Sequence, residues 1–336
     1  MKKVCFLLPE GMVKPSSLFG AIEVFEKANE FCIEKGNGPF YELSVAGSGI
    51  SQSLLDAQFM IQPGRHHLET LRPDIIVIPG LYEQDRYALD KNKALISWMV
   101  QRYAQGTELA SMCTGAFLLA ATGLLRHEEC STHWLAGRAF TNMFPDVYLR
   151  TDKIITAING IYTAGGAQSS LNLVLYLVEK YSGRPAALYC AKVLQIDIER
   201  SSQSPFIFFE GYKKHGDEII HKSQLYIEKN IDERITVEFL AGKFALSKRS
   251  FIRRFKKATQ HVPVEYIQKV KMESAKRELE QSRKNVNEVM YAVGYTDRKA
   301  FRNMFKKVTG LSPVDYRAKY NSAFSGEPSG AAAPGR

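Results

Sequence analysis

Residues 251–266 read FIRRFKKATQHVPVEY, and fifty positions later residues 301–316 read FRNMFKKVTGLSPVDY. Eight of the sixteen aligned pairs are identical, and a repeat of this kind indicates two copies of one structural unit. Each copy has two phenylalanines four residues apart, which fall on one face of a helix and can pack inward. The repeat therefore predicts two similar helices, each anchored by an aromatic pair.

The opposite face of each expected helix is strongly basic. Its side chains are Arg253, Arg254, Lys256 and Lys257 in the first copy and Arg298, Lys299, Arg302, Lys306 and Lys307 in the second. A cationic surface of this kind suits the phosphate backbone of nucleic acid. Two such helices in one small region predict a reader of double-stranded DNA.

The positive charge of the chain is confined to its rear part. Residues 1–204 hold 19 Lys and Arg against 20 Asp and Glu, whereas residues 205–321 hold 25 against 14. The formal net charge of +10 therefore comes from the region that contains the repeat. A basic segment joined to a nearly neutral one is typical of a DNA-binding domain attached to a partner domain, although a solvated lysine-rich surface is the alternative.

Length and composition exclude several classes of protein. With 336 residues the chain has room for two or three domains. Its five cysteines are scattered without a CxxC pair, and His66 and His67 are poorly spaced as ligands, so we expect no disulfide framework, no metal and no cofactor. The apolar run Val4 to Leu8 is too short for a signal peptide, and no segment has membrane-spanning character. A cytoplasmic protein without a membrane partner is expected.

Strand and helix signals alternate in the front half of the chain. The expected strands are Lys3–Leu8, Phe40–Ala46, the apolar run within 74–80, Glu108–Met112 and a pair within Ile154–Thr163, with helices near 17–35, 94–105, from 114, and 168–181. Apolar strands that alternate with helices predict a mostly parallel sheet. The expected fold class is α/β, a sheet flanked by helices as in a flavodoxin-like sandwich.

Changes in composition mark the expected domain boundaries. Residues 1–184 are expected to form the α/β domain, which would bind an effector and dimerise, and residues 185–220 read as a helical connector with a polar break. Residues 221–320 carry helical signals only and predict an all-α domain. The tail 321–336 is small, polar and rich in Gly and Pro, so we expect it to be disordered.

Two helix-turn-helix motifs can be placed within the all-α domain. The first combines a short helix near 236–243 with a second helix at 248–259, and the second motif places its second helix near 297–309. Ser247 and either Thr296 or Asp297 are candidate N-cap residues. In this geometry the second helix of each motif enters the major groove, so both helices are expected to read DNA.

The expected DNA contacts divide into base-reading and phosphate-binding residues. The first helical turn and the positions one turn later face the bases, which selects Arg249 and Arg253 in one helix and Lys299 and Asn303 in the other. Arg and Lys suit the acceptors of guanine, and Asn suits adenine. The expected phosphate contacts are Lys256, Lys257, Lys306 and Lys307, and Arg298 belongs to the same basic face.

The segment 108–134, ELASMCTGAFLLAATGLLRHEECSTHW, predicts a buried strand that turns abruptly into a helix at Cys113. Such an elbow exposes a thiol to the helix dipole and to free N–H groups, and His133 is a candidate partner. Cys113 has three interpretations: it lines an effector pocket suited to a carboxylate or carbonyl, it is an inert core thiol, or it is catalytic or redox-sensing. His133 could equally be a hydrogen-bonded core histidine.

Two stretches carry resemblances to known families. Residues 221–320 resemble the tandem helix-turn-helix domain of AraC/XylS-type regulators, most closely in GYTDRKAFRNMFKKVTGLSPVDYR. Residues 3–182 resemble the ThiJ/PfpI superfamily, with a class I glutamine-amidotransferase-like fold, through the IPG turn at 78–80, Cys113-Thr-Gly, STHW and YTAGGAQSS. This domain order is similar to that of GlxA-type transcription regulators. The resemblance implies an effector pocket that includes Cys113, Thr114, His133 and Gly80.

Departures from the family patterns bear on mechanism. Enzymes of the ThiJ/PfpI superfamily place an acidic residue near the reactive cysteine, but Ser16 or Ser17 stands at that place here. The pair Cys113 and His133 is therefore expected to be a vestige, and the protein is not expected to be an enzyme. In the second domain Ala245 and Gln260 stand where the family commonly has glycine.

We therefore predict a sequence-specific transcription regulator controlled by a small metabolite, which the resemblance suggests to be an amino acid, a betaine or a related nitrogen compound. Double-stranded DNA, a second copy of the chain and RNA polymerase are the expected partners. The alternative is a cysteine-dependent hydrolase or amidase fused to a DNA-binding module, and a passive architectural DNA binder is a third hypothesis.

Overall fold

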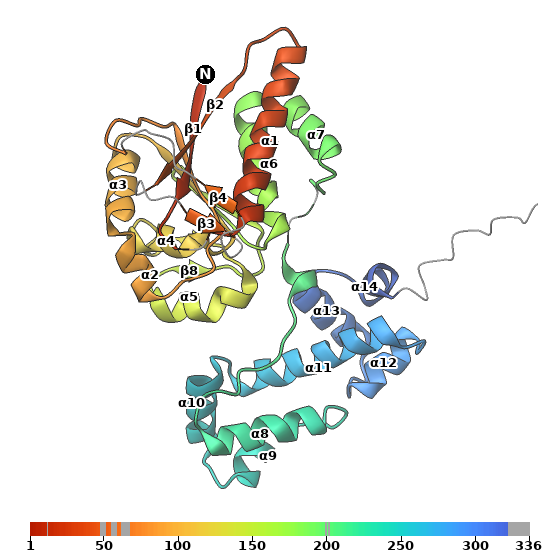
Figure 1. The fold of residues 1–336 in the computed structure, drawn as a ribbon. Coiled ribbons are helices and arrows are strands. Elements are labelled where there is room, and N and C mark those ends of the chain that lie inside the picture. The colour runs from red at the N-terminus through yellow and green to blue at the C-terminus, as the bar shows by residue number, and fades with distance from the viewer. Residues whose placement is uncertain are drawn as a thin grey trace, which may run out of the picture. The chain divides into compact units, whose positions relative to one another are not determined.

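The computed structural model describes residues 1–11, 13–47, 52–54, 59–61, 68–198, 200 and 202–321, and it divides into two compact units, Met1–Gln203 and Ser204–Arg336 (Figure 1). The adjacent pair His66 and His67 and the tail beyond residue 321 lie outside the described residues, so the expectations made for them stay predictions.

A six-stranded sheet forms the centre of unit 1. Its strands, in spatial order, are β2 (Tyr41–Gly47), β1 (Lys2–Leu8), β5 (Ile75–Ile78), β6 (Glu108–Met112), β10 (Ile161–Ala164) and β9 (Ile155–Ile158). All neighbours are parallel except β10 and β9, which pair antiparallel as a hairpin. In the middle of the sheet, Val4–Leu8 of β1 and the whole of β5 are apolar and buried, which is the pattern expected of a parallel sheet covered by helices. The predicted fold class of this unit is confirmed.

Helices cover both faces of the sheet (Figure 1). One layer consists of α1 (Pro15–Glu34), α6 (Leu171–Ser182) and α7 (Arg184–Val193), which contact one another. The remaining helices are α2 (Arg86–Lys91), α3 (Lys93–Ala104), α4 (Ala116–Ala121) and α5 (Gly137–Met143). Short pairs add β3 (Gln52–Leu54) with β4 (Phe59–Ile61), and β7 (Glu129–Cys130) with β8 (Tyr148–Leu149). Short 3-10 segments are η1 (Cys113–Gly115), η2 (Trp134–Ala136) and η3 (Gln168–Ser170).

Within its described residues unit 2 contains helices and no strand, as the sequence predicts. Its helices are α8 (Glu218–Lys229), α9 (Val237–Lys243), α10 (Lys248–Thr259), α11 (Pro263–Gln281), α12 (Val286–Ala292), α13 (Arg298–Thr309) and α14 (Pro313–Tyr320). Two separate hydrophobic cores lie along α11, one centred on Phe251 and Phe255 and the other on Phe301 and Phe305. Figure 1 shows α11 as the long helix between the two motifs. Its place confirms the expected spacer.

The sequence repeat corresponds to a repeat in packing. The ring centroids of Phe255 and Tyr266 are 5.2 Å apart, and those of Phe305 and Tyr316 are 5.3 Å apart. Thr259 and Thr309 make the same hydrogen bond in the two copies. Each hydroxyl donates at 2.8 Å to the carbonyl of the phenylalanine four residues earlier, Phe255 or Phe305. These identical pairs are buried, so packing and hydrogen bonding account for their repetition.

The turn of each motif needs a left-handed residue before the second helix. Ala245 has φ 51° in the first motif and Gly294 has φ 70° in the second. Ser247 then caps α10 by accepting from the Ser250 N–H. Of the two N-cap candidates for α13, Asp297 is the cap, and it accepts from the Ala300 N–H at 2.7 Å. Both helices therefore begin where local capping chemistry places them.

The expected connector at 185–220 contains α7, the 3-10 segment η4 (Ser204–Phe206) and an extended stretch before α8. This stretch lies on the helices of unit 2. Lys276 donates to the Ile207 carbonyl, the Phe209 N–H donates to Glu273 at 3.0 Å, and the Phe209 ring meets Tyr266 at 5.1 Å. Residues 204–217 are thus part of the second unit. No helix in the described part of the chain is long and apolar enough to cross a membrane.

Candidate DNA interface and elbow site

The proposed DNA-contacting residues lie exposed on the two second helices, α10 and α13. They are Arg249, Arg253, Lys256, Lys257, Arg298, Lys299, Asn303, Lys306 and Lys307. No hydrogen bond or ion pair joins any of these side chains to another described residue. They are therefore available to an external partner.

Two other cations of the first motif have internal partners. Arg254 donates to both carboxylate oxygens of Asp217, at 3.0 and 2.8 Å, and Asp217 also caps α8. Lys248 forms an ion pair with Glu238 of the preceding helix. Because its guanidinium is held within unit 2, Arg254 positions α10 against α8. Arg254 belongs to the basic face that the sequence predicts, but it is not among the expected DNA contacts, which include its exposed neighbour Arg253.

The exposed members of the repeat are the ones that packing does not explain. Lys256 and Lys257 are matched by Lys306 and Lys307, and all four are exposed at the C-terminal ends of α10 and α13. The last turn of a helix stabilises cations, but it does not require two lysines at the same positions in both copies. An external ligand that is shared by both copies and has regularly spaced anionic groups would require lysines at the same positions in both helices.

The elbow of unit 1 is built at Cys113. This residue follows β6 directly, has φ 54°, and is fully buried. A positive φ in a non-glycine residue is a strained conformation that the surrounding structure must hold. At Gly115 an added Cβ would lie 2.5 Å from the Pro79 carbonyl oxygen, so only glycine lets the elbow approach the end of β5. The predicted abrupt turn at Cys113 is present.

Hydrogen bonds fix the turn after β5 against the elbow. The Thr114 hydroxyl donates to the Leu81 carbonyl and accepts from the Leu81 N–H at 2.8 Å. The Ser17 hydroxyl accepts from the Gly80 N–H at 2.9 Å. Gly80 lies beside Cys113, since a Cβ at Gly80 would be 3.3 Å from the cysteine Cβ. The structure therefore brings together three of the four residues expected at the effector pocket, namely Gly80, Cys113 and Thr114. Through its hydrogen bonds to Leu81, Thr114 holds the turn after β5 in place.

The side chain that donates a hydrogen bond to the Cys113 sulfur is that of a lysine. The Lys14 Nζ lies 3.6 Å from the Cys113 Sγ and 5.8 Å from the centroid of the Tyr82 ring. Lys14 is the N-cap position of α1, which begins at Pro15. The sequence places Ser16 or Ser17 here and does not indicate Lys14, since nothing in the local pattern shows which way the long lysine side chain turns.

His133 lies close to the elbow. In the part of the chain that the structure describes, it makes no hydrogen bond to the Cys113 thiol. Its Nδ1 accepts from the Leu135 N–H at 3.2 Å, and its ring stacks on Trp134 with centroids 5.8 Å apart. Burial, and then the positive charge of Lys14, lower the pKa of His133. Because Nδ1 accepts the hydrogen bond from the Leu135 N–H, the neutral ring carries its own proton on Nε2. It is thus set up as a hydrogen-bond donor and not as the base for Cys113.

Gln203, the last residue of unit 1, is a functional candidate that the sequence did not indicate. Only 2% of it is exposed, and the two N–H groups of its Nε2 lie within hydrogen-bonding distance of three carbonyls, those of Thr132, Thr151 and Lys153. The hydroxyl of Thr132 in turn donates to the Cys113 carbonyl at 2.9 Å. Gln203, where the chain leaves unit 1, is therefore a buried anchor. It is linked to Cys113 at the elbow by two successive hydrogen bonds through Thr132.

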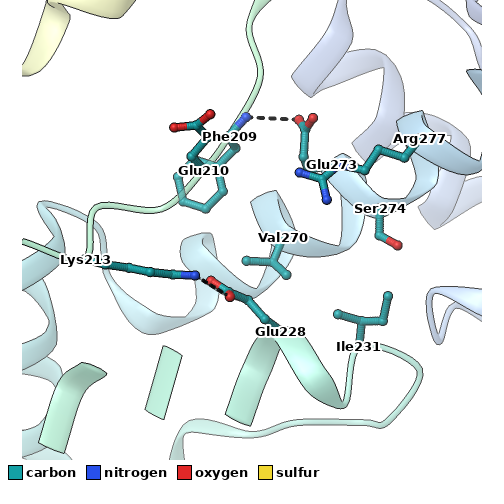
Figure 2. Close-up of a pocket in the computed structure, with 9 residues that line it drawn as sticks. All are labelled: Phe209, Glu210, Lys213, Glu228, Ile231, Val270, Glu273, Ser274 and Arg277. Atoms are coloured by element: carbon teal, nitrogen blue, oxygen red, sulfur yellow. Dashed lines mark hydrogen bonds and ion pairs between the residues drawn. The ribbon is translucent and has the colours of Figure 1, made fainter. Parts of the chain in front are cut away.

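Unit 2 contains a cavity of about 320 Å³ that the sequence also did not indicate (Figure 2). Its lining residues are Phe209, Glu210, Lys213, Glu228, Ile231, Val270, Glu273, Ser274 and Arg277. Figure 2 shows that Lys213 pairs with Glu228 and that the Phe209 N–H meets Glu273. The cavity lies between the 204–217 segment and helices α8 and α11. Within the described ranges, no group of His, Cys, Asp and Glu could hold a metal ion.

An α/β unit with a cysteine elbow, followed by two helix-turn-helix motifs, defines a class of two-domain helix-turn-helix proteins. The chain belongs to the DJ-1/PfpI family, whose model matches residues 2–180, and the model of a helix-turn-helix domain matches residues 240–319. The family resemblance predicted from the motifs is confirmed.

Among curated proteins, the HTH-type transcriptional regulator GbdR of Pseudomonas aeruginosa is 25% identical over 226 residues. That alignment covers 66% of this chain and 60% of GbdR, so this chain spans less than two thirds of that relative. The HTH-type transcriptional regulator GlxA of Rhizobium meliloti is 25% identical over 227 residues, which cover 65% of this chain and 67% of GlxA. A solved transcriptional regulator from Vibrio parahaemolyticus, 23% identical, covers 57% of this chain and 98% of its own with a TM-score of 0.51. It supports the α/β fold.

Proposed function

We propose that the protein is a sequence-specific, DNA-binding transcription regulator. The observation that carries the proposal is the duplicated helix, α10 and α13. Its proposed DNA-contacting side chains have no partner among the described residues, and its inward aromatics repeat with nearly equal geometry. Two recognition helices in one unit would occupy major-groove segments about one helical turn apart, roughly 34 Å. Arg249, Arg253, Lys299 and Asn303 would read bases, and the four repeated lysines would bind phosphates.

This proposal is tested by selecting bound sequences from a random double-stranded DNA library with the full chain. We expect enrichment of a site with two short elements about 10 base pairs apart. Fluorescence anisotropy on the enriched site and on scrambled DNA then gives the specificity ratio. Equal affinity for both, with a strong salt dependence, would instead make the protein an architectural DNA binder.

We further propose that unit 1 binds a small metabolite at the elbow and thereby changes DNA binding. Gly80, Cys113 and His133 would surround the ligand, with Thr114 holding the turn after β5. The coupling requires that the ligand favour one of two arrangements of the protein. Gln203 is anchored beside the elbow, and residue 204 already belongs to unit 2. The chain between these two residues could therefore carry the coupling from the ligand site to the DNA-binding unit. A second copy of the chain and RNA polymerase are the proposed protein partners.

A metabolite screen by thermal shift on the full chain tests the sensing proposal, with every hit checked by mass spectrometry after incubation. A ligand at a hundred times its dissociation constant adds about 2.7 kcal/mol of stability. Stabilisation with the compound returned unchanged, together with altered DNA binding, is the expected result.

The second candidate function is that of a cysteine-dependent hydrolase, which the strained backbone at Cys113 favours. Against it stand the engaged Nδ1 of His133 and the presence of Lys14, instead of a carboxylate, at the thiol. A product that wild type forms and Cys113→Ala does not would establish the enzymatic function.

A further inference from the structure

The segment 204–217, which we call the strap, contacts both of the proposed recognition helices, α10 and α13. At its start, Ser204 and Pro205 lie against the C-cap of α13, since a Cβ added to Gly310 would be 3.7 Å from the Ser204 Cβ and 3.8 Å from the Pro205 Cδ. At its end, Asp217 accepts two hydrogen bonds from Arg254 of α10, at 2.8 and 3.0 Å. Between these ends the strap runs along α11 in the opposite direction.

A buried charged pair of α11 holds the middle of the strap. Lys276 is only 3% exposed, and its Nζ donates at 2.6 Å to the carbonyl of Ile207 and at 2.9 Å to Glu273. Glu273 in turn accepts from the N–H of Phe209 at 3.0 Å. A buried ammonium needs such acceptors, because an unpaired charge away from water costs free energy. The strap backbone therefore completes a polar site that α11 alone leaves incomplete.

Further contacts fix the strap to the first motif. The ring of Phe209 meets that of Tyr266 with centroids 5.1 Å apart, and the Tyr212 carbonyl accepts from the Gln224 amide at 3.0 Å. Gly211 has φ 65°, and a Cβ there would collide with the Tyr266 hydroxyl. Because Tyr266 belongs to the core of the first motif, the strap can lie this close to that core only with glycine at position 211.

The two motifs have separate hydrophobic cores, which α11 and the hydrogen bonds of Lys271 connect. Separate cores joined along one helix resist rotation less than one shared core does, because fewer packed contacts must break. The strap adds another connection, from α13 at one end to α10 at the other. The placement of these two helices decides which spacing of DNA elements the protein fits.

We propose that the strap sets the relative placement of α10 and α13, and thereby the spacing between the two DNA elements that the protein accepts. This inference rests on the proposed DNA-binding function and deepens it. Because Lys276 is buried, it is a positioning residue that acts through the strap and not on DNA. Base preference within each element stays with the exposed side chains of α10 and α13, so spacing preference and base preference are separable.

The test measures binding of the full chain to duplexes that carry the selected site with its spacing changed by one or two base pairs in either direction. Each added base pair rotates one element by about 36° relative to the other, since a helical turn holds about 10 base pairs. Wild type should bind the selected spacing roughly 10-fold more tightly than the altered ones, the order of one lost base contact. Duplexes with a single element measure base reading alone.

Two substitutions release the strap without changing the exposed basic residues. Lys276→Met removes the donor to the Ile207 carbonyl and keeps the apolar stem, and Gly211→Ala forces the strap away from Tyr266. Both should lose most of the roughly 10-fold spacing preference and leave single-element affinity unchanged. Gly216→Ala is the matched control and should keep the preference, because Gly216 lies in the strap with φ 69° but has no atom within 4 Å of an added Cβ. Circular dichroism and urea unfolding check that each variant folds.

A measurement on wild type tests the same coupling without a variant. If the docked strap favours the selected spacing, DNA with that spacing must favour the docked strap by the same factor. Hydrogen exchange in peptides that cover residues 206–213 should therefore slow when the selected site is bound. It should slow less when a site with altered spacing is bound.

Three results would overturn the inference and leave DNA reading intact. They are variants that keep the spacing preference of wild type, a wild type that binds all spacings equally, and strap exchange that is the same on both kinds of DNA. Each would show that the strap does not set the spacing. If wild type showed no preference for the selected site over scrambled DNA, the proposed DNA-reading function would fail together with this inference.

Discussion

The Nε2 of Gln203 donates to the carbonyl oxygen of Thr132 at 3.1 Å, across 71 residues of sequence and inside the core of unit 1. The same amide reaches the carbonyls of Thr151 and Lys153. Gly165 makes room for it, because a Cβ there would lie 1.9 Å from Nε2. One side chain thus ties the end of unit 1 to the segment that holds the Cys113 carbonyl.

Gly165→Ala and Gln203→Ala should therefore be strongly non-additive. Gln203→Ala leaves buried carbonyls without a donor and should cost about 1–3 kcal/mol of unfolding free energy. Gly165→Ala should be damaging in wild type, where it collides with the amide, and much milder when Gln203 is alanine. Urea unfolding of the four proteins measures the coupling, expected at about 0.5–3 kcal/mol. Additive costs would show that the amide is not held where the structure places it.

The two turn positions of the helix-turn-helix motifs should respond in opposite directions. Gly294 has φ 70°, and an added Cβ would lie 2.3 Å from the Asp232 carbonyl oxygen, so Gly294→Ala should destabilise unit 2 by more than about 2 kcal/mol. Ala245 occupies the same kind of conformation with φ 51°. Ala245→Gly relieves that strain and should be neutral or stabilising by up to about 1 kcal/mol. Thermal unfolding checks both, and a cost for Ala245→Gly would contradict the reasoning.

Lys271 should be required to join the two motifs. Its Nζ donates at 3.0 Å to the carbonyls of Glu233, which precedes the first motif, and Val293, in the turn of the second. Lys271→Met retains the apolar stem and leaves two carbonyls without this donor, so we expect a loss of about 1–3 kcal/mol. The exposed Lys222, paired with Glu218 on the surface, is the matched control, and Lys222→Met should change stability by less than about 0.5 kcal/mol. Equal effects would refute the bridging role.

Acid should weaken the attachment of α10 to α8. Burial acts to raise the pKa of Asp217, but the hydrogen bonds from Arg254 and from the Ile220 N–H outweigh it and hold the pKa below its ordinary value. Since the folded-state pKa lies below the unfolded-state value, Asp217 contributes stability above about pH 4 that is lost as pH falls further. Asp217→Asn should be less stable than wild type at pH 7, and the difference should shrink towards pH 3. Unfolding curves at several pH values test this, and a constant difference would contradict it.

Base-reading and phosphate-binding residues should differ in what their loss changes. Arg249→Ala and Arg253→Ala should each cost about 1–3 kcal/mol on the selected site and relax preference at one or two base positions. Lys306→Ala should weaken binding to all sequences alike and lower the salt dependence by about one unit. Lys222→Ala, which removes a cation from another helix, serves as the control. If the arginine variants lost equal affinity on random DNA, the assignment would be wrong.

Sequence alone was sufficient for features that depend on neighbouring residues. The buried phenylalanines of the repeat, the parallel strands and the N-cap at Ser247 follow from periodicity and capping, which act over a few residues. The exposed basic residues of α10 and α13 could also be predicted, because a helix with an apolar face presents its remaining positions to solvent. For the same reason the family motifs could be found.

Only the tertiary structure decided the contacts between distant segments. The ammonium of Lys14 contacts the thiol of Cys113, 99 residues away in the sequence, and the ammonium of Lys271 contacts the carbonyl of Val293, 22 residues away. In each case a long flexible side chain could point in several directions, and the local sequence does not determine which one it takes. The sequence indicated a cysteine elbow without its carboxylate, but not that a lysine stands beside it. Arg253 and Arg254 share the predicted basic face, and only the structure shows that Arg254 pairs with Asp217. Helix faces are fixed by local geometry, whereas the partner of a long charged side chain is fixed by the packing of the whole unit.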